Sequence, residues 1–197
     1  MPGTTSNDLD FLYELGTLRN MRRGWHQHVM LPTASVMEHT LRVIWLAIII
    51  GKMENADLDK ITRMALVHDL TESRTSDHSY VEKVYVKEND ELAARDIFEG
   101  TSLTDYEEAW NQFESRESIE AKIVKDADNL DVDLEMRELE EQGSKLPKKW
   151  AQSRKLIRET KLYTESAKKI WDEIQTSDVS NWHLIANKWV KLPNAGK

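Results

Sequence analysis

The segment MALVHDLTESRTSD (64–77) places ionisable groups directly after an apolar stretch. His68 and Asp69 follow four apolar residues, Glu72 comes three positions later, and Asp77 ends a polar turn. A carboxylate near a protein core resists desolvation unless a partner stabilises it, and a divalent cation can stabilise two carboxylates at once. This pattern therefore indicates a metal site or an acid–base site.

Two other segments bring similar groups to apolar helix faces. In SVMEHTLRVIWLA (35–47), His39 shares a stripe with Val36 and Val43 at helical spacing. In IEAKIVKDADNLD (119–131), Asp128 lies at the edge of the apolar face. Two imidazoles and two carboxylates suit Mn, Co, Fe, Ni or Zn better than they suit calcium, which prefers oxygen ligands alone. The candidate metal ligands are His39, His68, Asp69 and Asp128.

Each of these features alone has an ordinary structural explanation. A single histidine on an apolar face is more often a core residue, and an HD dipeptide occurs by chance. The aspartates of the run DADNLDVD (126–133) are typical of a solvated helix face. The ordered combination on successive amphipathic helices favours a shared site.

The same residues carry a family resemblance. His39, the His68–Asp69 pair and Asp128 resemble the H…HD…D signature of the HD-domain metal-dependent phosphohydrolases. Four segments are similar to the 5′-deoxynucleotidase branch of that family: MRRGW, SVMEHT, ALVHDLTESRTSD and AKIVKDADNLD. The resemblance covers roughly residues 8–140. It implies an all-α fold and one divalent ion (Mn, Co, Mg, Fe, Ni or Zn) held by the four candidate ligands, with Asp128 preferred over its neighbour Asp126.

The resemblance also implies catalytic residues. Glu72 and Asp77 match the positions that help the attacking water, although the sequence does not assign the acid and base roles between them. Ser76 stands where relatives often have glycine, which could alter the turn before Asp77.

Substrate-binding residues are expected in the MRRGW segment (21–25). Arg22 and Trp25 match the positions that contact the phosphate and the sugar or base, and Arg23 is the alternative to Arg22. Trp25 could form a wall at the sugar 2′ position or anchor the loop to the core. Arg74 is a further candidate at a phosphate-binding mouth.

Apolar positions recur at helical spacing along the chain, and 7 Gly with 4 Pro disfavour a strand-and-turn architecture. We expect helices at about 7–20, 34–52, 57–74, 88–99, 104–114, 117–142, 154–176 and 180–190. Gly143 and Pro147 place a loop at 141–150. The predicted architecture is a single all-α HD-domain helical bundle over residues 1–197, with its core at about 8–140 and a C-terminal helical extension at about 150–190.

Composition limits the cellular context. The chain has no cysteine, which excludes disulfides and thiolate metal sites and fits a cytoplasmic location. The net charge of −8 disfavours nucleic acid and anionic membranes as partners. The start of the chain (1–10) does not resemble a signal peptide, and the longest apolar run (43–50) is too short to span a bilayer. The family resemblance implies a small nucleotide substrate and a homodimer, with core or interface anchors among Trp45, Trp110, Trp171, Trp182 and Trp189.

The predicted activity is metal-dependent hydrolysis of the phosphomonoester of (deoxy)nucleoside 5′-monophosphates. An alternative on the same site is hydrolysis of a nucleoside triphosphate or another phosphorylated metabolite. A non-catalytic nucleotide-binding regulator is a different class of protein. Glu72 and Asp77 argue against it, because binding alone does not need them.

Overall fold

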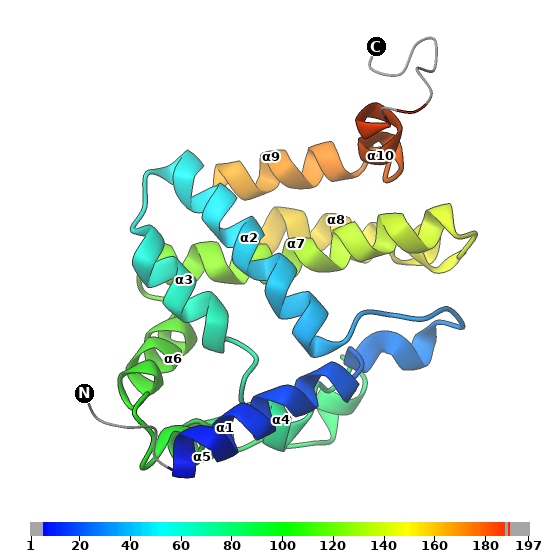
Figure 1. Cartoon of the computed structure of the whole chain (residues 1–197). Coiled ribbons are helices and arrows are strands. Elements are labelled where there is room, and N and C mark those ends of the chain that lie inside the picture. The colour runs from blue at the N-terminus through cyan, green and yellow to red at the C-terminus, as the bar shows by residue number, and fades with distance from the viewer. Residues whose placement is uncertain (1–5, 188, 190–197) are drawn as a thin grey trace.

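The computed structural model describes residues 6–187 and residue 189, and within that part of the chain it contains helices and no strand (Figure 1). The all-α prediction is therefore confirmed. The helices are α1 (Ser6–Thr17), α2 (Val36–Glu54), α3 (Leu58–Val67), α4 (Glu72–Thr75), α5 (Asp90–Phe98), α6 (Asp105–Ser115), α7 (Ile119–Glu141), α8 (Leu146–Thr160), α9 (Glu165–Ile174) and α10 (Asn181–Ala186).

Two sequence predictions reach beyond the described range. Residues 1–5, on which the signal-peptide prediction partly rests, lie outside it, as do residues 188 and 190 of the helix expected at 180–190. Among the described residues, no helix combines the length and apolar character that crossing a bilayer requires.

The start of α2 is set by a capping box. Ser35 Oγ accepts a hydrogen bond from the Glu38 backbone N–H at 3.2 Å, and the Glu38 carboxylate accepts one from the Ser35 N–H at 2.6 Å. The helix ends at Asn55, whose left-handed φ of 55° stops it. His39 therefore lies in the first turn of a helix with a defined start, on its buried face.

The main core lies where α2 crosses α7 and packs against α3 (Figure 1). Ile50 of α2, Ile61 and Met64 of α3, and Ile123 and Leu130 of α7 are almost completely buried there. Burying one side chain of this size contributes about 1.5–3 kcal/mol. This core holds together the three helices that carry or precede the candidate ligands.

A second core fixes the chain on both sides of the His68–Asp69 pair. Val67 and Leu70 are buried beside Phe98 of α5 and Trp110 of α6. Since the residues before and after the pair are both anchored in apolar surroundings, the pair itself has little freedom to move.

The helix expected at 57–74 is interrupted, which corrects the prediction of one continuous helix through Glu72. α3 ends at Val67. The residues that follow form a tighter turn with hydrogen bonds between residues three apart, from Leu70 N–H to Val67 C=O at 3.1 Å and from Glu72 N–H to Asp69 C=O at 3.2 Å. The direction of Glu72 is therefore set by this turn rather than by the face of α3.

The C-terminal region also differs from the expectation. The segment expected as a loop at 141–150 already contains the start of α8, with Pro147 in its first turn, where a missing backbone N–H costs little. The single helix expected at 154–176 is divided into α8 and α9. α8 runs back along α7 (Figure 1).

The break between α8 and α9 is stabilised by Asp126 of α7. Its carboxylate accepts hydrogen bonds from the Tyr163 N–H at 2.7 Å and from the Thr164 N–H and Oγ1 at 2.8 Å. The following helix buries Ala167 and Ile174 in the main core, so this part of the C-terminal extension packs on the same core as α2, α3 and α7.

Candidate metal centre and active site

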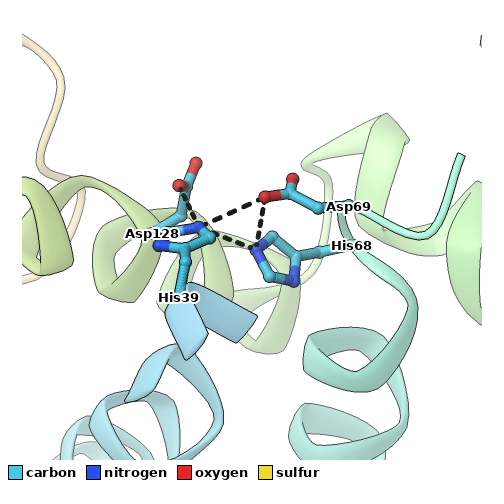
Figure 2. Close-up of side chains that lie close together, drawn as sticks. All are labelled: His39, His68, Asp69 and Asp128. Atoms are coloured by element: carbon cyan, nitrogen blue, oxygen red, sulfur yellow. Dashed lines mark hydrogen bonds and ion pairs between the residues drawn. The ribbon is translucent and has the colours of Figure 1, made fainter. Parts of the chain in front are cut away.

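The four candidate ligands converge although they come from three parts of the chain (Figure 2). One ligand atom from each of His39, His68, Asp69 and Asp128 lies within 4.8 Å of the other three. His39 Nε2 is 3.3 Å from His68 Nε2, 3.2 Å from Asp69 Oδ2 and 3.3 Å from Asp128 Oδ1. All four side chains point toward one another from α2, the turn after α3, and α7 (Figure 2).

The ring nitrogens on the far side of the two imidazoles are already engaged. His39 Nδ1 is 2.6 Å from the Asp131 carboxylate, and His68 Nδ1 is 2.9 Å from the Ala65 carbonyl. Both partners only accept hydrogen bonds, so in the neutral rings each Nδ1 carries the hydrogen and each Nε2 presents a lone pair to the cluster.

This arrangement fits a divalent metal ion. Two Nε2 lone pairs facing each other at 3.3 Å repel unless a cation or a proton lies between them. A metal ion bonded at about 2.1 Å to adjacent ligands holds those ligand atoms roughly 3 Å apart. The donor set and its spacing therefore suit one transition-metal ion, and Asp131 and the Ala65 carbonyl would orient its two histidines.

Burial and the charges of neighbouring side chains shift the pKa values of the cluster residues. Burial opposes a charge on His39, but hydrogen bonds to the surrounding carboxylates raise its pKa well above the usual value. Burial likewise opposes charge on Asp69 and Asp128, yet the imidazoles beside Asp69, and Lys125 and His39 beside Asp128, hold the pKa of both carboxyls well below the usual range. Asp69 and Asp128 therefore stay ionised, and the space between the four ligand atoms favours a cation.

The acidic run of α7 is not a solvated face, which corrects the simplest interpretation of that run. Asp126, Asp131 and Asp133 are buried, and each has a defined partner; that of Asp133 is Arg154, at 2.7 Å. The sequence analysis did not recognise Asp131 as a residue of the site. Its position three residues after Asp128, on the same helix face, is the signal that could have identified it.

Arg23 is the arginine that reaches the cluster. It is buried, with Nη1 3.0 Å from Asp69 Oδ2, Nε 3.2 Å from Asp77 Oδ2 and Nη2 3.9 Å from Asp128 Oδ1. Burial opposes its charge, but these carboxylates raise its pKa further above the usual arginine value. Of the two adjacent arginines in MRRGW, the second therefore lies at the site.

Arg22 and Arg74 are not brought to the cluster, contrary to the expectation for substrate-binding residues. Arg22 donates to the Thr33 carbonyl at 2.6 Å and lines a separate cavity of about 390 Å³. Arg74 forms a two-pronged ion pair with Glu14 of α1, both contacts at 2.8 Å. The donors of these two side chains are directed to partners outside the cluster.

Trp25 is buried against Met136 and Leu139 of α7, and its ring centroid lies 6.0 Å from that of Trp150 of α8. These contacts are those of a loop anchor, which was one of the two roles considered for this residue.

Asp77 connects the turn after α4 to the loop that contains Arg23 and Gly24, here called the arginine loop. Its carboxylate accepts a hydrogen bond from the Gly24 N–H at 3.0 Å in addition to contacting Arg23. A Cβ at Gly24 would lie 2.2 Å from the Asp77 carbonyl oxygen, so only glycine permits this close approach. The residue before Asp77 is strained: Ser76 has φ 72° and ψ 152°, a region that glycine occupies almost alone.

Glu72 faces a cavity of about 260 Å³ beside the cluster, whose wall also includes His68 and Asp69. Its Oε2 is buried and has no hydrogen-bond partner among the described residues. Burial, together with the charges of Asp69 and Asp77, holds the pKa of Glu72 well above the usual carboxyl value. Glu72 is therefore placed to hold a proton at the cavity wall.

Comparison with known proteins agrees with this geometry. The HD domain family profile matches residues 15–171. A relative from Dictyostelium discoideum, named 5′-deoxynucleotidase HDDC2, is 32% identical over 158 residues, which cover 73% of this chain and 83% of that protein. The chain therefore belongs to the HD-domain metal-dependent phosphohydrolases, in their 5′-deoxynucleotidase branch.

Solved structures share the fold. A conserved hypothetical protein from Pyrococcus furiosus aligns with a TM-score of 0.72 and 22% identity, over 86% of this chain and 99% of that one. The HD phosphohydrolase DatZ of cyanophage S-2L, which was solved bound to dA and one catalytic Zn²⁺ ion, aligns with a TM-score of 0.54 and 18% identity, over 90% of this chain and 100% of that one.

Two neighbouring aspartates of α7 give a matched test of the metal site. Asp128→Asn should lower the affinity for a divalent metal at least about 100-fold, because an amide is a poor replacement for an anionic ligand. Asp126→Asn should keep the metal but lower the free energy of unfolding by about 2–3 kcal/mol, because its amide would face the Thr164 and Tyr163 donors. Metal analysis and urea denaturation measure the two effects, and a fully metallated Asp128→Asn protein would contradict the ligand assignment.

The strain at Ser76 predicts a stabilising substitution. Ser76→Gly should raise the free energy of unfolding by about 1 kcal/mol, because glycine adopts this backbone conformation without a Cβ clash. Thr75→Gly, one residue earlier in α4, is the control and should destabilise the protein. Urea unfolding of both variants decides the point; a loss of stability in Ser76→Gly would show that the backbone there is not strained.

Proposed function

We propose that this protein hydrolyses the phosphomonoester of nucleoside 5′-monophosphates, using one divalent ion (Mn, Co, Mg, Fe, Ni or Zn) held by His39, His68, Asp69 and Asp128. The observation that carries the proposal is the convergence of these four ligands beside a polar cavity whose wall includes His68 and Asp69. The name of the Dictyostelium relative supports the choice of substrate class. When bound, the ion supplies electrophilic polarisation of the phosphoryl group and acidification of water.

Glu72 is the proton-handling residue in this proposal. Its Oε2 belongs to a residue of the cavity wall and has no hydrogen-bond partner in the described structure, and burial with the charges of Asp69 and Asp77 raises its pKa above the usual carboxyl value. A carboxyl in this position can take and give a proton. Asp77 has a different position, because its carboxylate is engaged by Arg23 and by the Gly24 N–H. We therefore assign proton transfer to Glu72 and positioning of Arg23 to Asp77.

Arg23 has the task of balancing charge. It contacts Asp69 and Asp77 and lies close to Asp128, so it offsets the repulsion among carboxylates that must sit close together. Since its donors are directed to these carboxylates, it acts mainly by holding the ligands in place.

The substrate panel that tests the function contains matched ribo- and deoxyribonucleoside 5′-monophosphates and the corresponding triphosphates, assayed for phosphate release with each of Mn, Co, Mg, Fe, Ni and Zn. We expect the deoxyribonucleoside monophosphates to be cleaved fastest. Equal rates for both sugars would remove the deoxy preference, and faster cleavage of triphosphates would favour the alternative substrate class. No phosphate release with any of these metals would refute the proposal.

Glu72→Gln should keep the bound metal and lower kcat about 10²- to 10⁴-fold, because the amide cannot transfer the proton. Metal content and turnover are measured on the same preparation. Loss of the metal in this variant would instead make Glu72 a ligand or a support of the ligands.

We also propose that the enzyme is a homodimer that associates through α2. Leu41, Trp45, Ile49 and Met53 are exposed and lie four residues apart, so they form one apolar stripe on the outer face of that helix. Trp45 is 61% exposed, an unusual state for a tryptophan without a partner.

Trp45→Glu should convert the dimer into a monomer, because it places a charge in the centre of the stripe. Arg95→Glu, at an exposed position of α5 away from this helix, is the control and should leave the dimer intact. Light scattering after gel filtration measures both; a dimeric Trp45→Glu protein would place the contact elsewhere.

A further inference from the structure

The cavity beside the metal cluster has buried polar atoms in its wall that lack a hydrogen-bond partner. Among the described residues these atoms are Glu72 Oε2, Trp110 Nε1 and Arg116 Nη1, while Glu88 Oε1 has only a long ion-pair contact with His78 Nε2 at 3.9 Å. Leaving a buried polar group without a partner is costly, and more so if it is charged. Such atoms around one cavity indicate a place built to receive a polar ligand.

The basic side chains of the wall are not those expected from the sequence. Among the described residues, they are Lys83, Arg116 and Lys125, whereas Arg23 contacts the ligand carboxylates and is absent from the wall. Within the described part of the chain, the wall also carries five carboxylates, so an anionic group that enters the cavity would need Arg116 and Lys125 to offset their repulsion. These carboxylates are Asp69, Glu72, Glu88, Asp90 and Glu114.

Arg116 is held in a defined place by Phe113. Its guanidinium carbon lies 3.4 Å from the centroid of the Phe113 ring, and the same ring meets the imidazole of His68 edge-on at 5.8 Å between centroids. Arg116 and a metal-site histidine thus contact the same aromatic ring. Its guanidinium makes a long contact from Nη2 to Glu114 Oε1 at 3.3 Å, and its Nη1 has no hydrogen-bond partner among the described residues, which leaves a donor for a ligand.

The backbone of Arg116 supports the same conclusion. This residue ends α6 with φ 54°, in the left-handed region where glycine or asparagine is usual. The Cβ of an arginine is strained in this conformation. A long charged side chain at such a position needs a compensating role, and the cavity offers one.

Lys125 approaches the cluster from α7. Its Nζ lies 2.7 Å from Asp128 Oδ2, so one of its three donors is occupied by a metal-site carboxylate. The wall thus has two cations near the metal ligands. Lys125 contacts the ligand Asp128, and Arg116 stacks on Phe113, whose ring also contacts the ligand His68.

We propose that Arg116, with Lys125, binds the phosphate group of the substrate in this cavity. The inference rests on the proposed phosphomonoesterase function and assigns to these two residues the recognition of non-bridging phosphate oxygens, a task for which the sequence suggested Arg22, Arg23 or Arg74. A guanidinium fork fits two phosphate oxygens at once. Arg116 lies outside all four segments that carry the family resemblance.

The test uses the metal-loaded full-length protein and inorganic phosphate as the probe. Arg116→Gln should raise the inhibition constant for phosphate and lower kcat/KM for a deoxyribonucleoside monophosphate, each by about 10- to 100-fold. Metal content should not change, and Arg116→Lys should recover part of the loss. Arg95→Gln, an exposed arginine of α5, is the matched control and should behave as the wild type.

A second variant separates binding from folding. Arg116→Gly removes the guanidinium at a backbone position that suits glycine, so it should lose phosphate affinity to the same extent without a loss of stability. If the wild-type enzyme is active and either variant keeps the wild-type phosphate inhibition constant and kcat/KM, this inference is wrong. If the wild-type enzyme releases no phosphate from any nucleotide, the proposed function itself fails.

Discussion

The rest of the site depends on one close approach, that of His39 Nε2 and His68 Nε2 at 3.3 Å. Two imidazole lone pairs at this distance are stable only around a positive centre. Other contacts hold the two rings in this position. Asp131 binds Nδ1 of His39 and the Ala65 carbonyl binds Nδ1 of His68, while the core formed by α2, α3 and α7 fixes the backbone. The folded chain therefore creates a cation site by bringing together donors that would repel one another without the cation.

Concentrating carboxylates around that point requires further cations, and the structure supplies them from two directions. Arg23 enters from the loop before α2 and contacts Asp69 and Asp77, while Lys125 contacts Asp128 from within α7. The glycine at position 24 allows the arginine loop to touch the turn that contains Asp77. Local backbone strain at Ser76 is found in this same turn, where the packing of two loops determines the conformation.

The C-terminal region is part of the structure that supports the site. Trp150 of α8 packs against Trp25 of the arginine loop, and Asp126 of α7 organises the start of α9. Two aspartates separated by a single residue on α7 therefore have different tasks, Asp126 in the fold and Asp128 at the cluster. Their side chains leave the helix in different directions, because successive residues are rotated by about 100° and these two by about 200°.

The sequence by itself determined the helical fold and the identity of the four converging side chains. His39 and Asp128 lie on long helices, where a period of 3.6 residues reliably predicts which face is buried. The tertiary structure alone decided which arginine reaches the cluster, that Glu72 follows a tight turn, and that Arg116 lines the cavity. Those outcomes depend on contacts between segments far apart in the chain, such as Arg23 with Asp69 and Arg23 with Asp77, and local periodicity has no information about which loops meet.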